Sequence, residues 1–145
     1  MVVKQGIFLL WMIMMMSSEL QACEVTVQHA WLRLPPPVSD TAAAYMQLNN
    51  HCQTTKQLKS ISSPQASMVM MHHVKMKMMQ SLVLKPQDGF TFQPKANHVM
   101  LMGLKAPIHK DTKVTLILHW QDGHQQTLQL EVKDMRGESM QGMNM

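Results

Sequence analysis

Short segments of strand-like sequence, separated by turn signals, dominate the chain after residue 23. About eight of them follow one another at spacings near ten residues, and many alternate apolar with polar side chains. Strong turn signals lie between them at residues 86–89 and at Asp122-Gly123. No stretch has the period of an amphipathic helix. The pattern predicts an all-β protein, a single-domain Greek-key β-sandwich with Trp31 and Trp120 in its core.

The first 22 residues differ from this pattern and have the three parts of a secretory signal peptide. Lys4 supplies a positive charge, residues 7–16 are an apolar run too short to span a bilayer, and a polar stretch ends at Ala22. We expect residues 1–22 to be removed on export to the periplasm; a short membrane anchor is the alternative. The domain then covers residues 23–133, and residues 134–145 form a flexible, methionine-rich tail.

The two cysteines, Cys23 and Cys52, allow two interpretations. Export implies an oxidising compartment, which favours a disulfide between them. If the first two strands pair antiparallel with Trp31 facing Ala44, Cys23 lies opposite Cys52. The alternative is a lipid anchor on Cys23, because Leu20-Gln21-Ala22-Cys23 resembles a bacterial lipobox, although its glutamine fits that pattern poorly.

A histidine and a methionine two residues apart stand out in the segment His98-Val99-Met100-Leu101-Met102-Gly103-Leu104-Lys105. Residues i and i+2 of a strand point to the same face, so His98 and Met100 should project side by side. Met102 continues this alternation but lies deeper in the strand, and we expect it in the core. Imidazole and thioether groups form a soft ligand set, which selects Cu(I) over magnesium, calcium or manganese.

A second cluster of methionines, at residues 68–79, surrounds two adjacent histidines. In an extended strand His72, Met76 and Met78 share one face. His73 then lies on the other face, and a tight turn after it would change this parity. Thioethers suit an exported copper site, because thiols in an oxidising space are lost to disulfides. The alternative is that these methionines only fill a core that has few aromatic side chains.

Other classes of function have less support in the sequence. The net charge of +4 comes from scattered lysines, whereas nucleic-acid binding needs a basic stripe with interleaved aromatics. No Ser-His-Asp set or carboxylate pair indicates an enzyme. A blue-copper electron carrier needs a cysteine thiolate with two histidines, and Cys52 lies in a polar turn far from the strand of His98.

The motif from His98 to Lys105 resembles the signature of the PCuAC family of periplasmic copper chaperones. The resemblance covers residues 24–132 and includes Ala30-Trp31-Leu32-Arg33, Ala44-Tyr45-Met46, Ser63-Pro64 and Val69-Met70-Met71-His72. It implies a cupredoxin-like β-sandwich that binds one Cu(I). It also implies delivery of copper to the CuA or CuB centre of respiratory cytochrome c oxidase.

The same resemblance implies a set of four copper ligands, namely His72, Met76, His98 and Met100. Met76 precedes His98 by the family's spacing of 21 intervening residues, and Met100 completes its His-x-Met pair. Only three residues separate His72 from Met76, where the family has ten. Two alternatives therefore stay open: His73 in place of His72, and Met78 or Met79 in place of Met76.

Three hypotheses about function follow. The first is an exported Cu(I) metallochaperone whose partner is a copper-accepting oxidase subunit or assembly factor. The second is a periplasmic copper-sequestering or tolerance protein, and the third is a metal-free structural β-sandwich. In each we expect a monomer that is not an enzyme and binds no nucleic acid. Contact with a membrane is expected only if Cys23 is lipidated.

Overall fold

The computed structural model describes residues 23–75 and 77–135, and the predicted signal peptide and most of the predicted tail lie outside them. Regular structure within these residues consists of ten strands: β1 (Val25–Arg33), β2 (Ala42–Asn50), β3 (Lys56–Ser62), β4 (Ala66–His72), β5 (Met78–Met79), β6 (Leu82–Leu84), β7 (Gly89–Phe92), β8 (His98–Leu104), β9 (Val114–Trp120) and β10 (Gln125–Lys133). The described part of the chain has no helix long and apolar enough to cross a membrane.

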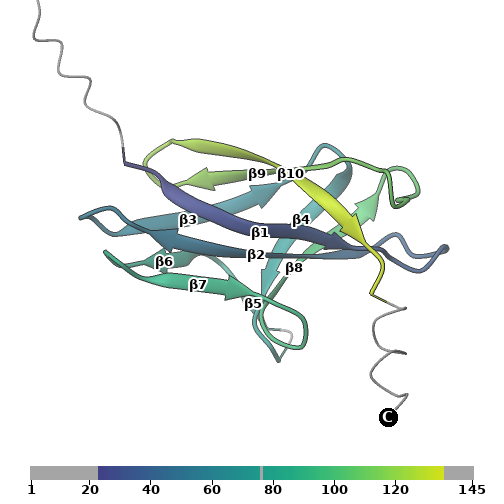
Figure 1. The fold of residues 1–145 in the computed structure, drawn as a ribbon, viewed down its shortest axis with the longest axis horizontal. Helices are drawn as coiled ribbons and strands as arrows, with labels where there is room; N and C mark the ends of the chain where they lie inside the picture. The colour runs from purple at the N-terminus through teal and green to yellow at the C-terminus, as the bar shows by residue number, and fades with distance from the viewer. Residues whose placement is uncertain (1–22, 76, 136–145) are drawn as a thin grey trace, which may run out of the picture.

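The strands form a two-layered sandwich joined along one side. The strand order is β5-β4-β8-β2-β1-β10-β9-β3-β6, with β7 also paired to β2. β10 belongs to both layers: residues 125–130 pair antiparallel with β9, and residues 131–133 pair in parallel with β1. In Figure 1, β9 and β10 run along the upper side of the domain, with β2, β7 and β8 below them. The predicted all-β sandwich is confirmed.

The core between the two layers is built mainly from leucines. Eight are completely or almost completely buried: Leu32, Leu48, Leu58, Leu84, Leu101, Leu116, Leu118 and Leu130. Burying each such side chain contributes roughly 1.5–3 kcal/mol, which makes this cluster the main source of stability. Among the described methionines only Met46, Met71 and Met79 belong to the core. Core packing therefore explains only a minority of the methionines in the described part of the chain.

A disulfide joins the start of the domain to the turn after β2. Cys23 is bonded to Cys52 with a Cα–Cα distance of 5.6 Å, and Val25 faces Asn50 beside it. The predicted disulfide is therefore present in the structure. One sulfur atom cannot carry both a disulfide and a thioether-linked lipid, so this arrangement is incompatible with an acyl anchor on Cys23.

The pairing of β1 with β2 shifts by one residue further along the strands. A bulge lies between Gln28 and Trp31, and His29 within it adopts a φ of 53°. Trp31 consequently faces Tyr45, and their ring centroids are 4.7 Å apart. The predicted pairing of Trp31 with Ala44, and its place in the core, are both wrong, because the extra residue reverses the alternation. Trp120 is buried as predicted.

Candidate metal centre

Histidines and methionines occupy matching positions on the outer face of β4 and β8. The two strands are antiparallel neighbours. In their register three pairs of these residues lie directly opposite each other: His72 with His98, Met70 with Met100, and Met68 with Met102. The residues between them, including Met71, Val99 and Leu101, are buried in the core. Directly opposed Cβ atoms lie about 4.5–5.5 Å apart in such a sheet, so one ion can reach both members of a pair.

Alternation along β8 sets the orientation of its side chains. Val99 and Leu101 are completely buried, so His98 and Met100 share the outer face, as their spacing predicts. The expectation that Met102 lies in the core is wrong, because its side chain is 37% exposed. The next residue of β8 is Gly103, whose φ is +65° and where an added Cβ would lie 2.8 Å from the Ser67 hydroxyl. Glycine is required at this position for both reasons.

β4 and β5 form an antiparallel hairpin, so the chain turns after His73 and does not continue as one extended strand. β4 ends at His72, and the His73 amide donates a hydrogen bond of 2.8 Å to the Lys77 carbonyl as the chain reverses. β5 then places Met78 opposite His72 and Met79 opposite Met71. Met78 therefore lies on the outer face with His72, 51% exposed, whereas Met79 is buried.

This hairpin bears on the four ligands implied by the family resemblance. His72, His98 and Met100 lie together on the outer face of β4 and β8. The fourth, Met76, lies outside the described residues. Of the alternatives, Met78 is next to His72 across the β4–β5 pair. His73 is exposed beyond the end of β4, and Met79 is on the core side.

The hydrogen bonding of the two opposed histidines leaves nitrogen lone pairs available. The His98 Nδ1 lies 3.2 Å from the Ala96 carbonyl oxygen, which only accepts hydrogen bonds, so Nδ1 carries the proton. The lone pair of neutral His98 is then on Nε2, the usual arrangement for a metal-binding histidine. The His72 Nδ1 is buried and has no hydrogen-bond partner within the described residues. The two rings meet edge to face, with centroids 5.4 Å apart.

The environment of His72 favours its neutral form. Burial lowers the pKa of His72 below 6.5, and repulsion from a charged His98 lowers it further. A neutral imidazole is the form that binds a metal. The unpartnered buried nitrogen and the lowered pKa therefore both suit a ligand that is ready to accept an ion without first losing a proton.

We expect the free energy of unfolding of the metal-free protein to decrease as the pH is lowered from 7 toward 5, partly through His72. The unfolded chain takes up a proton there with an ordinary pKa near 6.5, whereas the folded protein resists protonation. The unfolded state thus binds more protons in this range and is favoured by acid. Urea unfolding at both pH values should show a smaller decrease for His72→Gln. Equal decreases in both proteins would contradict this role for burial.

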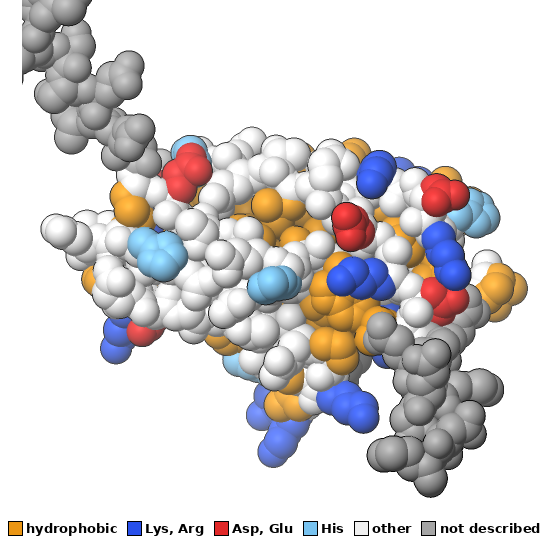
Figure 2. Space-filling model, in the orientation of Figure 1, with side chains coloured by type: hydrophobic (Ala, Val, Ile, Leu, Met, Phe, Trp, Pro, Cys, Tyr) orange, Lys and Arg blue, Asp and Glu red, His pale blue; other side chains and the backbone are white. Residues whose placement is uncertain are grey.

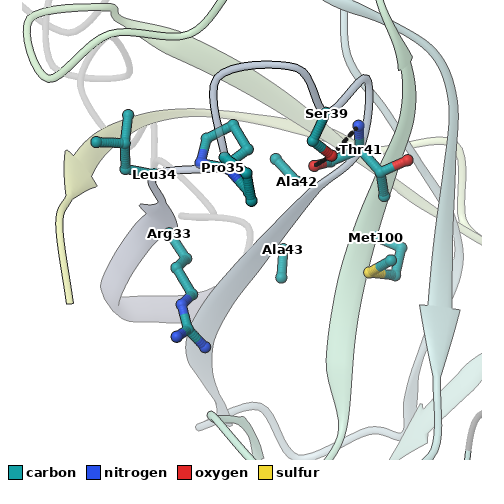
Figure 3. Close-up of a pocket in the computed structure, with 9 residues that line it drawn as sticks. Arg33, Leu34, Pro35, Ser39, Thr41, Ala42, Ala43 and Met100 are labelled. Carbon is teal, nitrogen blue, oxygen red and sulfur yellow. Dashed lines mark hydrogen bonds between the residues drawn. The ribbon is translucent and has the colours of Figure 1, made fainter. Parts of the chain in front are cut away.

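Openings on both sides of the outer face give access to its side chains. A pocket of about 330 Å³ borders Met100 and is lined mainly by β2 and by the loop that follows β1, from Arg33 to Thr41. Figure 3 shows the Met100 sulfur on the side of Ala43, whose small side chain leaves this space open. A second pocket of about 250 Å³, between β3 and the β4–β5 hairpin, is bordered by Met70 and Met78.

Charged side chains do not supply an alternative metal site. Within the described residues no group of three or more histidine, cysteine, aspartate or glutamate side chains is placed to hold an ion. On the face drawn in Figure 2, basic and acidic side chains lie interspersed and not in a basic stripe. A candidate metal site in this part of the chain would therefore have to combine imidazoles with thioethers.

Met70 is the site residue that the sequence analysis missed. It lies directly opposite Met100 and adjacent to His72 on the same face of β4. The signal that identified Met100, a methionine two residues from a histidine, is equally present in Met70-Met71-His72.

The sequence pattern of the family described as "Putative lipoprotein LpqE-like" matches residues 25–132. This range contains all ten strands, except that β10 continues for one more residue. The chain belongs to this LpqE-like family. One curated relative is "Putative lipoprotein Lxx21020" from Leifsonia xyli subsp. xyli. It is 29% identical over 125 residues, which cover 81% of this chain and 74% of the relative.

Solved structures similar to this LpqE-like protein include PCuAC domains. The "Copper-bound PCuAC domain from PmoF2" has a TM-score of 0.70 with 21% identity, and covers 78% of this chain and 96% of that one. The solution structure of "CuI-DR1885" from Deinococcus radiodurans has a TM-score of 0.68 with 32% identity, and covers 81% of this chain and 83% of that one. The first likeness shows the fold alone and confirms the cupredoxin-like sandwich.

Proposed function

We propose that this LpqE-like protein is an exported Cu(I) metallochaperone. The observation that carries the proposal is the cluster of imidazoles and thioethers on the outer face of β4 and β8. Such ligands are soft and neutral, and they favour Cu(I) over harder ions. The 32% identical relative from Deinococcus radiodurans, whose solution structure is that of CuI-DR1885, supports the same ion here.

The proposed ligands are His72, His98 and Met100, together with one thioether from the β4–β5 hairpin. Met76 has the spacing that the family resemblance implies. The pairing of β4 with β5 favours Met78, because it places Met78 opposite His72 on the outer face. Single replacements of each by leucine would identify the fourth ligand, because only the true ligand should weaken binding of Cu(I) when it is lost.

Handover of the ion, and not catalysis or electron transfer, is the role that suits this ligand set. A blue-copper site needs a thiolate, and both described cysteines are joined in a disulfide. Neutral imidazole and thioether ligands add no negative charge that would hold Cu(II). The open pockets beside Met100 and beside Met78 leave room for a partner's ligands to approach the ion.

We further propose that the protein acts in the periplasm, as a monomer, and delivers copper to the CuA or CuB centre of cytochrome c oxidase. Its partner would be a copper-accepting oxidase subunit or an assembly factor. The signal-like sequence of residues 1–22 and the disulfide support an oxidising compartment outside the cytoplasm. The lipoprotein name of the family is compatible with export, whereas the disulfide at Cys23 favours a chain that is not anchored there.

A deletion strain tests delivery against sequestration. We expect it to lose cytochrome c oxidase activity when copper is scarce, and to regain activity on adding either copper or the wild-type gene. A gene carrying His98→Ala and Met100→Ala should not restore activity, although its product accumulates normally. Full oxidase activity combined with sensitivity only to excess copper would contradict delivery and favour sequestration.

A further inference from the structure

We propose a second site for a soft monovalent cation, built only from thioethers, at the end of β4 and β8 away from the histidines. Its ligands are Met68 and Met102, with Met70 as the third. The site takes Cu(I) or its analogue Ag(I). The inference rests on the proposed function only for the identity of the natural ion, since the thioethers do not depend on the histidine site.

The register brings these three sulfur atoms within reach of one point. Met68 and Met102 are directly opposed across the antiparallel pair, so their Cβ atoms lie about 4.5–5.5 Å apart. Met70 is the next residue on the same face of β4, roughly 7 Å along the strand. Each methionine side chain is long and unbranched with three rotatable bonds, so the three sulfurs can converge without movement of the backbone.

The exposure of Met68 and Met102 distinguishes them from core methionines. Met68 is 54% exposed and Met102 is 37% exposed, whereas the buried positions of the same strands are held by Met71, Val99 and Leu101. These two thioethers bury less apolar surface than the core methionines Met46 and Met71, and so contribute less to the stability of the fold. Their sulfur atoms, in contrast, are accessible to an ion from solvent and are not protonated at any ordinary pH.

The second site adjoins the first one on a continuous face. The successive rows are His72 with His98, Met70 with Met100, and Met68 with Met102. The middle row has a sulfur on each strand: Met100 belongs to the first site and Met70 to the proposed thioether site, so the two sites are directly adjacent. An ion could therefore move between the two sites by exchanging one thioether at a time, without passing through water as a free ion. This arrangement would give a carrier of copper two positions on one face.

Titration with Ag(I) at neutral pH, followed through the ¹³C-labelled methyl groups of methionine, tests the second site. We expect the first equivalent to shift Met100, and the second equivalent to shift Met68, Met102 and Met70. In His72→Ala/His98→Ala the shifts of Met68 and Met102 should persist. If these two methyl signals do not move in either protein, or move only at the excess that shifts the methionines of residues 136–145, the second site does not exist.

Leucine substitutions provide a second test that does not depend on the histidine variant remaining folded. Met68→Leu/Met102→Leu should bind one equivalent of Ag(I) fewer than the wild type, with an unchanged first equivalent and an unchanged urea midpoint. Leucine conserves most of the side-chain volume at these exposed positions but removes the sulfur. An unchanged stoichiometry would overturn the second site. If His72→Ala/His98→Ala loses only the first equivalent of Ag(I) and keeps the second, the result supports the second site and concerns the histidines of the proposed chaperone site alone.

Discussion

Replacing both His98 and Met100 with alanine is expected to lower the affinity for Cu(I) by at least about 100-fold. Loss of supporting groups that only orient metal ligands already costs 10–100-fold in affinity, and these two residues would contact the ion themselves. Their removal also takes away the partner that faces His72 across the sheet and the thioether that faces Met70. Titration against a competing Cu(I) chelator under reducing conditions measures the effect.

A matched control distinguishes loss of a ligand from a general effect of removing histidine. His109→Ala alters an exposed histidine in the loop between β8 and β9 and should leave the Cu(I) affinity unchanged. The double variant should remain folded, since Val99 and Leu101 keep β8 attached to the core. Equal uptake of copper by the wild type and the double variant would show that the proposed centre is wrong and would favour a metal-free role for the domain.

Removal of the disulfide is expected to lower the free energy of unfolding by about 3 to 4 kcal/mol. Cys23 and Cys52 are 29 residues apart in the sequence, and their bond closes a loop that contains β1 and β2. A closed loop of that length restricts the unfolded chain and so raises its free energy. Urea unfolding of Cys23→Ser/Cys52→Ser against the oxidised wild type measures the difference.

The native structure around Cys52 should persist in this variant. The buried Asn50 accepts a hydrogen bond from the Cys52 amide and donates to the carbonyls of Thr54, Leu84 and Lys85. The loss should therefore appear as a change of midpoint and not as a loss of the native fold. Intact mass of the exported protein gives an independent check, because a disulfide removes two hydrogens whereas an acyl anchor adds mass. The same urea midpoint in both proteins, or an acylated Cys23, would contradict the prediction.

Local alternation was a sound guide to the strands wherever one face of a strand is buried. β8 and β9 follow it closely, since hydrophobic side chains at every second position pack into one core. It failed at β1, where the bulge at His29 reverses the alternation and places Trp31 beside Tyr45. A bulge depends on the partner strand as well as on the residue itself, so one strand's sequence does not reveal it.

The same distinction applies to the candidate site. His98 and Met100 were predicted together because two residues of one strand share a face for purely local reasons. Met78 and Met70 owe their places to pairing between strands: Met78 lies opposite His72 only because the chain reverses after β4, and Met70 opposite Met100 only because β4 and β8 are neighbours. Met102 was wrongly expected in the core, because it shares the outer face of β8 with His98 and Met100.

The sequence by itself determined which residue types are available to bind a soft ion, and that the chain would form a β-sandwich. These properties follow from side-chain chemistry and from a backbone period of two residues, and both are local. Only the tertiary structure decided which methionines of residues 23–75 and 77–135 stand beside a histidine and which fill the core. Strand register brings together residues 26 to 34 positions apart, and register is set by the fit of the whole core.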